Sequence, residues 1–182
     1  MAILVPVADG SEDIETVSII DVLRRAERDV VVASAGEALT VTAARGTRIT
    51  ADAMLSVQDT AWEMIALPGG LRGAENLARC QPLQELLRRQ DAAGRWIAAI
   101  CAAPALVLAP LGLLDSRQAT CYPAFRAHLA HWQDRPVVQD GHLITSQGPG
   151  TALAFGLQLV AALADLGLSQ RIGEQMLVPA GV

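Results

Sequence analysis

The chain has 182 residues, of which 52% are hydrophobic and 18% are charged, and it carries a formal net charge of −5. This composition supplies enough apolar side chains for a full core, so we expect one domain spanning residues 1–182. The fourteen basic residues, all arginine, are scattered along the chain, which argues against nucleic acid or an anionic membrane surface as a partner.

The three cysteines, Cys80, Cys101 and Cys121, are odd in number and lack the close spacing of a zinc site. They predict neither a disulfide framework nor a metal centre, and they favour a reducing compartment such as the cytoplasm. The first ten residues have no basic segment and only a short apolar run, so we expect a strand there and no signal peptide.

The first part of the chain alternates predicted strands with a helix. Residues 2–8 and 29–35 are short, rich in β-branched side chains and apolar on both faces, as buried strands are. Between them, residues 11–27 repeat apolar side chains at helical period, and we expect Ser11 to cap this helix. Residues 39–52 alternate threonine with apolar side chains around a central Arg-Gly pair, which predicts an antiparallel hairpin.

The alternation of strands and helices continues to the end of the chain. Further strands are predicted at residues 64–68, 95–100, 118–123 and 142–146, and helices at residues 81–94 and 150–167. We expect Gly167 to end the last helix. This order implies an α/β fold with a mostly parallel sheet covered by helices on both faces. Functional side chains gather at the carboxyl ends of the strands in such a sheet.

A long apolar stretch raises the question of a membrane span. Nineteen uncharged residues separate Arg95 from Asp115, a length that suits a transmembrane helix. A spanning helix would have to contain two prolines and a glycine in its interior. A strand that ends at Cys101, followed by a helix with Pro104 in its first turn, accommodates all of them. We therefore expect no membrane span.

Cys101 lies between this predicted strand and helix and is followed by two alanines. The arrangement is typical of a nucleophile elbow, in which small neighbours let the backbone come close to a raised side chain. The N-terminus of the following helix favours a thiolate, so we expect a pKa for Cys101 well below ~8.5. The alternative is an inert core cysteine, because cysteine is among the most commonly buried residue types.

Two other segments end or follow strands at the same edge of the predicted sheet. Gly69 and Gly70 form a turn whose amides suit an oxyanion, although tight-turn glycines are an equally simple explanation. Glu15 shares a helical face with Ile19 and Val22, so we expect it to point inward with a raised pKa. A protonated Glu15 could donate a hydrogen bond to a neighbouring anion. Acidic residues in a first helical turn otherwise only complement the helix dipole.

Four segments, in their order and spacing, resemble the ThiJ/PfpI superfamily and, within it, the DJ-1-like branch. They are PVADGSEDIET, ALPGGLRGAENL, AAICAAPALVL and TSQGPGTALAFG. The resemblance covers nearly the whole chain. It implies a flavodoxin-like three-layer αβα sandwich, a nucleophile-elbow cysteine and a homodimer.

The resemblance also implies roles for individual residues. Cys101 corresponds to the elbow cysteine, Glu15 to its protonated partner, and the amides of Gly70 and Ala102 to the oxyanion site. The positions that the resemblance places around the pocket are Gly69, Tyr122, Arg25, Arg45 and Pro149. The two arginines align with arginines near the family's dimer interface and would line a small anion pocket. An outward helix arginine and a hairpin-turn arginine are the alternative.

The chain departs from the family at two positions. Peptidase-like relatives carry histidine directly after the cysteine, where this chain has Ala102, so a Cys-His peptidase is not supported. The DJ-1-like branch often has histidine where this chain has Tyr122. A tyrosine with a pKa of ~10 is no base near pH 7, so proton transfer falls to Glu15 or to the thiol itself. We take Cys80 and Cys121 to be structural.

These inferences predict a cytoplasmic homodimer with Cys101 as its reactive centre and no cofactor. The first hypothesis is a cysteine-dependent glyoxalase or protein deglycase with a stress-protective role. Its substrate would be a small reactive aldehyde such as methylglyoxal, or a glycated protein or metabolite. The second hypothesis is a redox sensor or chaperone in which Cys101 is oxidised to sulfinate beside Glu15. A cysteine peptidase or amidotransferase-like hydrolase is less favoured.

Overall fold

The computed structural model describes residues 1–58 and 61–179. Its strands are β1 (Ile3–Val7), β2 (Val30–Ser34), β3 (Thr40–Thr42), β4 (Arg48–Thr50), β5 (Ala53–Met54), β6 (Met64–Leu67), β7 (Trp96–Ile100), β8 (Val137–Asp140) and β9 (Leu143–Ser146). Its α-helices are α1 (Asp13–Arg25), α2 (Leu71–Arg79), α3 (Gln81–Ala92), α4 (Ala152–Leu163) and α5 (Leu166–Gln175). Shorter π- or 3₁₀-helical segments are Pro104–Leu108, Ala109–Leu111, Pro123–His128 and Pro149–Thr151.

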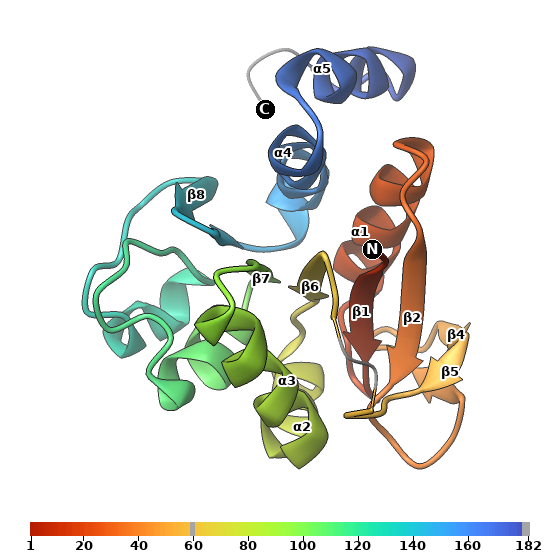
Figure 1. Cartoon of the computed structure of the whole chain (residues 1–182), viewed down its shortest axis with the longest axis vertical. Coiled ribbons are helices and arrows are strands. Elements are labelled where there is room, and N and C mark those ends of the chain that lie inside the picture. The colour runs from red at the N-terminus through yellow and green to blue at the C-terminus, as the bar shows by residue number, and fades with distance from the viewer. Residues whose placement is uncertain (59–60, 180–182) are drawn as a thin grey trace.

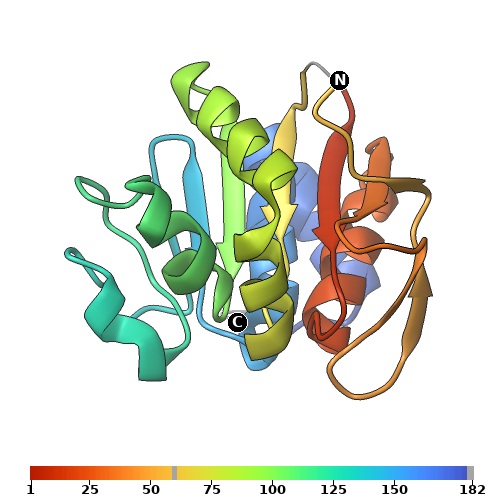
Figure 2. The same ribbon diagram turned by 90° about the horizontal axis from the view of Figure 1, so that it is seen from below.

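The main sheet has seven strands in the order β5-β2-β1-β6-β7-β9-β8. Neighbouring strands are parallel except β8 and β9, which are antiparallel. Helices cover both faces of the sheet (Figures 1 and 2): α1 and α4 pack together on one face with α5 against α4, and α2 and α3 lie on the other. The chain therefore has the predicted flavodoxin-like three-layer α/β fold, with a mostly parallel sheet.

The core lies on both sides of the central strands. Every residue of β1, β6 and β9 is buried, as continuous apolar runs in a covered parallel sheet require. Helix α1 turns Ile19 and Val22 toward this core. Its close approach to α4 depends on Gly156, where a Cβ would lie only 3.0 Å from the Cβ of Val22. These contacts fix α1, and so the side chain of Glu15, against the sheet.

The carboxyl ends of the central strands converge on one edge of the sheet. The strand order reverses between β1 and β6, and ligands bind at such a reversal in open α/β sheets. Strand β1 leads into the loop with Gly10, β6 into Gly69 and Gly70, and β7 into Cys101. The antiparallel hairpin of β3 and β4, predicted from the alternating threonines, docks at this edge through a hydrogen bond from the Gly10 amide to the Thr42 carbonyl of 2.8 Å.

The helical segment after Cys101 is present but is shorter and less regular than an α-helix. Pro104 begins a single π-helical stretch, and Pro110 lies in the 3₁₀ turn that follows it. Because proline has no amide hydrogen, Pro110 cannot continue a regular α-helix. Gly112, with φ of 74°, ends the segment in the left-handed region. No helix among residues 1–58 and 61–179 is long and apolar enough to cross a bilayer.

Two expected helix boundaries are wrong. Helix α1 begins after Glu12, and the Ser11 hydroxyl instead accepts a hydrogen bond of 3.1 Å from the Ala8 amide within the loop. The last predicted helix ends at Leu163, so Gly167 does not close it. The predicted helix is divided at Asp165. The side chain of Asp165 accepts a hydrogen bond of 2.8 Å from the Leu168 amide and so caps a separate helix, α5.

The strand expected at residues 118–123 is also wrong. Only one bridge forms in this stretch, between Ala119 and Trp132. The next amide, that of Thr120, donates to the side chain of Thr145 at 2.9 Å and so is unavailable to a ladder. Pro123 then starts a 3₁₀ segment. Strands β5 and β8 and helix α2 were not anticipated. Strand β5 has only two residues, and α2 follows a glycine pair.

Candidate active site

Cys101 immediately follows β7 in a strained backbone conformation. Its φ is 63°, a left-handed value that residues with a Cβ seldom adopt. Two backbone hydrogen bonds hold it there: the Cys101 amide donates to the Ser146 carbonyl at 2.9 Å, and its carbonyl accepts from the Tyr122 amide at 2.8 Å. The side chain is only 9% exposed. Cys101 thus lies in a strained turn between a central strand and a short helical segment.

Two backbone amides face the sulfur of this cysteine. The amides of Gly70 and Ala102 lie near Sγ of Cys101 and lower its pKa. Gly70 has φ of 80°, and a Cβ at this position would overlap the carbonyl oxygen of Gly10. Only glycine fits both the backbone conformation and the space, so the position of the Gly70 amide near the sulfur requires glycine at this residue.

The Glu15 carboxyl lies beside the cysteine and is fully buried. Its Oε2 accepts a hydrogen bond of 2.8 Å from the Gly69 amide, and its Oε1 has no hydrogen-bond partner among the described residues. A Cβ on Gly69 would lie 2.6 Å from the Cβ of Cys101 and 2.8 Å from Glu15 Oε2. The missing side chain of Gly69 therefore lets the carboxyl and the thiol come together.

Burial determines the protonation of this pair. It raises the pKa of Glu15 to about 7, an effect that the Gly69 hydrogen bond opposes and the nearby charge of Glu12 reinforces. The prediction of an inward-facing Glu15 with a raised pKa is confirmed. Burial, together with the negative charge of Glu15, also raises the pKa of Cys101 to about 12, against the amides of Gly70 and Ala102.

The prediction of a readily ionised Cys101 is therefore wrong for the free protein. The amides facing Sγ do lower the pKa, but loss of water and the adjacent carboxylate outweigh them. Two negative charges side by side in a buried site are unfavourable, so Glu15 and Cys101 together retain a proton at neutral pH. A carboxylate with a pKa of about 7 beside a thiol can take the thiol proton when the sulfur reacts.

The backbone amide of Tyr122 donates a hydrogen bond to the carbonyl of Cys101, and the Tyr122 side chain is 45% exposed. Its ring packs near Gly148, where a Cβ would lie 3.4 Å from the ring, and Pro149 follows directly. Phe125 and His128 continue the aromatic cluster, with ring centroids 6.2 Å apart.

The two arginines expected around the pocket lie at different places. Arg45 is exposed in the hairpin turn, and its amide donates to Asp13 Oδ2 at 2.8 Å, which ties the hairpin to the start of α1. Arg25 is the last residue of α1 and forms an ion pair of 2.8 Å with Asp21. Ten residues of helix, about 15 Å, separate it from Glu15. Within one chain, the structure does not bring Arg25 to Cys101.

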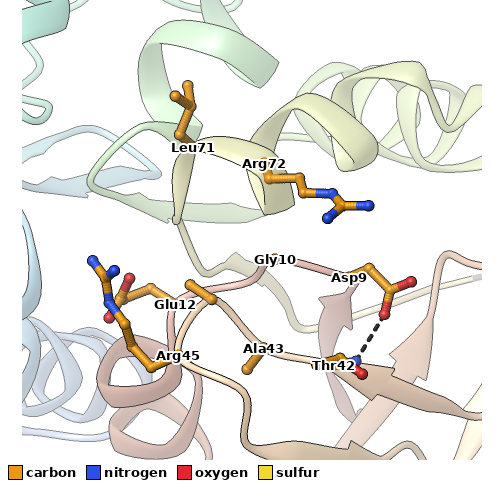
Figure 3. Close-up of a pocket in the computed structure, with 9 residues that line it drawn as sticks. Asp9, Gly10, Glu12, Thr42, Ala43, Arg45, Leu71 and Arg72 are labelled. Atoms are coloured by element: carbon orange, nitrogen blue, oxygen red, sulfur yellow. Dashed lines mark hydrogen bonds between the residues drawn. The ribbon is translucent and has the colours of Figure 1, made fainter.

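A cavity of about 490 Å³ lies beside the site (Figure 3), between the loop after β1, the hairpin and the start of α2. The residues that line it are Asp9, Gly10, Glu12, Thr42, Ala43, Ala44, Arg45, Leu71 and Arg72. Sequence reasoning missed Glu12 and Arg72. Glu12 precedes Glu15 by three residues and so shares its helical side, and Arg72 is two residues after Gly70.

The other two cysteines, Cys80 and Cys121, lie elsewhere in the fold. Cys121 is fully buried, and burial raises its pKa to about 11. Cys80 is half-buried at the junction of α2 and α3. Both positions agree with a structural reading.

The fold and this site define a class: flavodoxin-like α/β proteins with a strained cysteine at the end of a central strand and a buried glutamate beside it. The model of the DJ-1/PfpI family matches residues 1–162, and the chain belongs to that family. The resemblance seen in the sequence is thereby confirmed.

Several relatives support the assignment. Protein dj-1beta of Drosophila melanogaster is 38% identical over 180 residues, which is 96% of each chain. Glutathione-independent glyoxalase DJR-1.2 of Caenorhabditis elegans is 37% identical over 166 residues, covering 88% of this chain and 87% of the relative. A solved structure of oxidized Toxoplasma gondii DJ-1 superposes with a TM-score of 0.95 at 40% identity, covering 97% of both chains. The chain spans only 38% and 42% of two Arabidopsis thaliana relatives.

Proposed function

We propose that the protein is a cofactor-independent, cysteine-dependent glyoxalase or deglycase acting on methylglyoxal or its adducts. The observation that carries the proposal is the contact of Cys101 with a buried Glu15 whose pKa is about 7. A general acid–base is most effective with a pKa near the working pH. A relative that is 37% identical carries the name glutathione-independent glyoxalase. A cytoplasmic, stress-protective role accords with this chemistry.

The first step is attack on the aldehyde carbon. Glu15 accepts the thiol proton as Sγ of Cys101 forms a bond to that carbon, and the proton then passes to the aldehyde oxygen to give a hemithioacetal. The amides of Gly70 and Ala102, which already face Sγ, are available to the oxygen as it becomes negative. The thiolate thus forms only as it reacts, which accommodates the high pKa of the free thiol.

The second step moves a proton between two carbons of the bound substrate. Glu15 removes the hydrogen of the sulfur-bearing carbon as a proton and returns a proton to the neighbouring carbon, while the hydroxyl proton of the first carbon passes to the oxygen of the second. The first carbon is oxidised and the second reduced, so a thioester of lactate forms on Cys101 without an external oxidant. Water then attacks the thioester carbonyl, the carbon–sulfur bond breaks, and lactate leaves as the thiol regains its proton.

Lactate release from methylglyoxal tests the proposal. Wild-type protein should form lactate, Cys101→Ala should form none, and Cys80→Ala, which removes a half-buried thiol away from Glu15, should keep most of the rate. Equal rates for wild type and Cys101→Ala would contradict the proposal. A metal chelator should leave the rate unchanged.

The second candidate is a redox sensor or chaperone in which Cys101 becomes a sulfinate. It is favoured by the unpartnered Oε1 of Glu15, which in the protonated acid could donate to a sulfinate oxygen. A solved relative from Toxoplasma gondii is described as oxidized. If wild-type protein releases no lactate while peroxide converts Cys101 alone to sulfinate, this candidate replaces the first.

We also propose a homodimer. Ile14 and Val17 on α1 and Leu153 on α4 are exposed and line a shallow, largely apolar pocket of about 330 Å³. A second copy would remove these side chains from water. The native mass in solution should be twice 19.1 kDa, and Val17→Arg should halve it. A monomer at micromolar concentration would contradict the dimer.

A further inference from the structure

The cavity beside Cys101 contains positive charge that no neighbouring carboxylate neutralises by direct contact. Arg45 and Arg72 are exposed, and among the described residues neither guanidinium forms an ion pair or a hydrogen bond. Figure 3 shows the two side chains extending from opposite walls, one from the hairpin and the other from α2. Unpaired guanidinium groups at the rim of a hollow are suited to planar anions.

Two carboxylates also line the cavity. One is Glu12, which is 8% exposed and whose charge raises the pKa of the neighbouring Glu15. Figure 3 shows Arg45 on the same side of the cavity as Glu12, so part of its charge is offset there. Arg72 extends from the start of α2 toward the other side of the view, where Asp9 lies. Of the two carboxylate oxygens of Asp9, one already accepts from the Thr42 amide at 2.7 Å.

The wall of the cavity is continuous with the reactive site. The amide of Gly70 faces Sγ of Cys101, and the next two residues, Leu71 and Arg72, line the cavity. The cavity therefore adjoins the reactive site along the chain. Leu71 is exposed and offers an apolar surface to a bound compound.

From this arrangement we infer that the cavity binds the non-reacting part of the substrate, and that Arg72 recognises a single carboxylate on it. The inference rests on the proposed function for the chemistry at Cys101. It names the substrate class as low-molecular-weight methylglyoxal adducts of carboxylate-bearing thiols or amines. The acidic groups of Asp9 and Glu12 line the same cavity, so a dianionic phosphate would meet more repulsion than a carboxylate does. A glycated residue within a polypeptide has no free α-carboxylate of its own.

A binding measurement tests this inference without any turnover. The probes are N-acetyl-S-(2-oxopropyl)cysteine, a stable thioether related to the hemithioacetal, and its carboxamide, which differs only in lacking the charge. Calorimetric titration of wild-type protein should give a dissociation constant about 5-fold lower for the carboxylate than for the amide, as expected for an exposed charge-assisted contact. Equal dissociation constants for the two probes, or binding of neither, would overturn the inference.

Two variants assign the effect to its residue. Arg72→Gln should abolish the preference for the carboxylate, whereas Arg79→Gln, an exposed arginine on the same helix outside this cavity, should keep it. A preference that survives in Arg72→Gln would contradict the role of Arg72. Both side chains are exposed, so neither change should unfold the protein.

Turnover measurements distinguish failure of the proposed function from failure of the role assigned to Arg72. With the hemithioacetals of methylglyoxal with N-acetylcysteine and with N-acetylcysteine amide, Arg72→Gln should raise KM for the first about 5-fold more than KM for the second. Absence of lactate from every substrate, with the binding preference intact, would sink the proposed function and leave the binding role of the cavity. Turnover with no carboxylate preference would sink only the inference about Arg72.

Discussion

Replacement of Glu15 by glutamine should stabilise the protein at neutral and mildly alkaline pH, although it removes a proposed catalytic group. Burial raises the pKa of Glu15 from its ordinary value of 4.5 to about 7. The folded protein therefore holds this proton more tightly than the unfolded chain does. The associated stability is fully present below pH 4.5 and is lost as the pH rises through 7.

The size of the effect follows from the difference between the two pKa values. Each pKa unit corresponds to about 1.4 kcal/mol, so the pKa of about 7 against 4.5 gives a loss of about 3 kcal/mol between pH 4.5 and 8. Glutamine has the shape of the protonated acid and can still accept from the Gly69 amide. Glu15→Gln should therefore lack this loss and exceed wild type at pH 8 by about 3 kcal/mol.

Urea unfolding of the reduced proteins, followed by tryptophan fluorescence at equal concentration, measures this difference. It should be made from pH 4.5 to 8, below the range in which Cys101 loses its proton. Other titrating groups cancel in the difference between wild type and variant. Glu75→Gln, an exposed carboxylate on α2, is the matched control and should follow wild type within about 0.5 kcal/mol. Parallel profiles for wild type and Glu15→Gln would show that folding does not raise the pKa of Glu15 and would refute the reasoning.

Three further results are expected. The rate of lactate formation should rise with pH through about 7, as Glu15 becomes the carboxylate that accepts the thiol proton, and a rate that falls over this range would contradict that role. Gly70→Ala should destabilise the protein by more than about 1 kcal/mol and abolish activity, because its Cβ would overlap Gly10, whereas Gly46→Ala, with φ of 95° and open space around it, should cost only the backbone strain and keep activity. Tyr122→Phe should change the rate modestly and Tyr122→His should raise it by adding a base, and complete loss in the phenylalanine variant would show that the hydroxyl is essential.

The parts of the site that the sequence predicted are those encoded by local patterns. A buried strand followed by Cys101 and two alanines specifies the strand-to-helix turn, and the glycine pair after the next strand specifies a close backbone approach. The inward face of Glu15 follows from the helical spacing of its apolar neighbours. Each of these signals lies within a few residues of the feature that it predicts.

The protonation of the thiol could not be predicted in this way, because it depends on packing between segments distant in the sequence. The rule that a helix N-terminus lowers a cysteine pKa is local, and the amides of Gly70 and Ala102 follow it. The opposing effects, burial and the carboxylate of Glu15, arise only once the fold brings Glu15 and Cys101 together at Gly69. The cavity next to Cys101 has the same origin, since it lies between the loop after β1, the hairpin and α2.

Irregular segments were the other source of error. The stretch with Thr120 has a strand-like composition, but its amide bonds to the side chain of Thr145 and no ladder forms. The run that ends at Leu163 continues to look helical in the sequence, and only the capping role of Asp165 divides it. In both cases one side-chain hydrogen bond outweighs the hydrophobic pattern, and composition does not reveal which side chain will make it.

The most direct measurement of the central claim is the site of covalent attachment during turnover. Protein mixed with methylglyoxal, quenched with acid within the first turnover and digested with trypsin gives the three cysteines on separate peptides, because arginines lie between them at Arg95 and Arg117. The account predicts an acid-stable thioester adduct of methylglyoxal mass on the peptide of residues 96–117, absent from Cys101→Ala and also from Glu15→Gln, because Glu15 moves the protons that form the thioester. Lactate formation with an unmodified Cys101 peptide, or with the adduct on Cys80 or Cys121 instead, would contradict it.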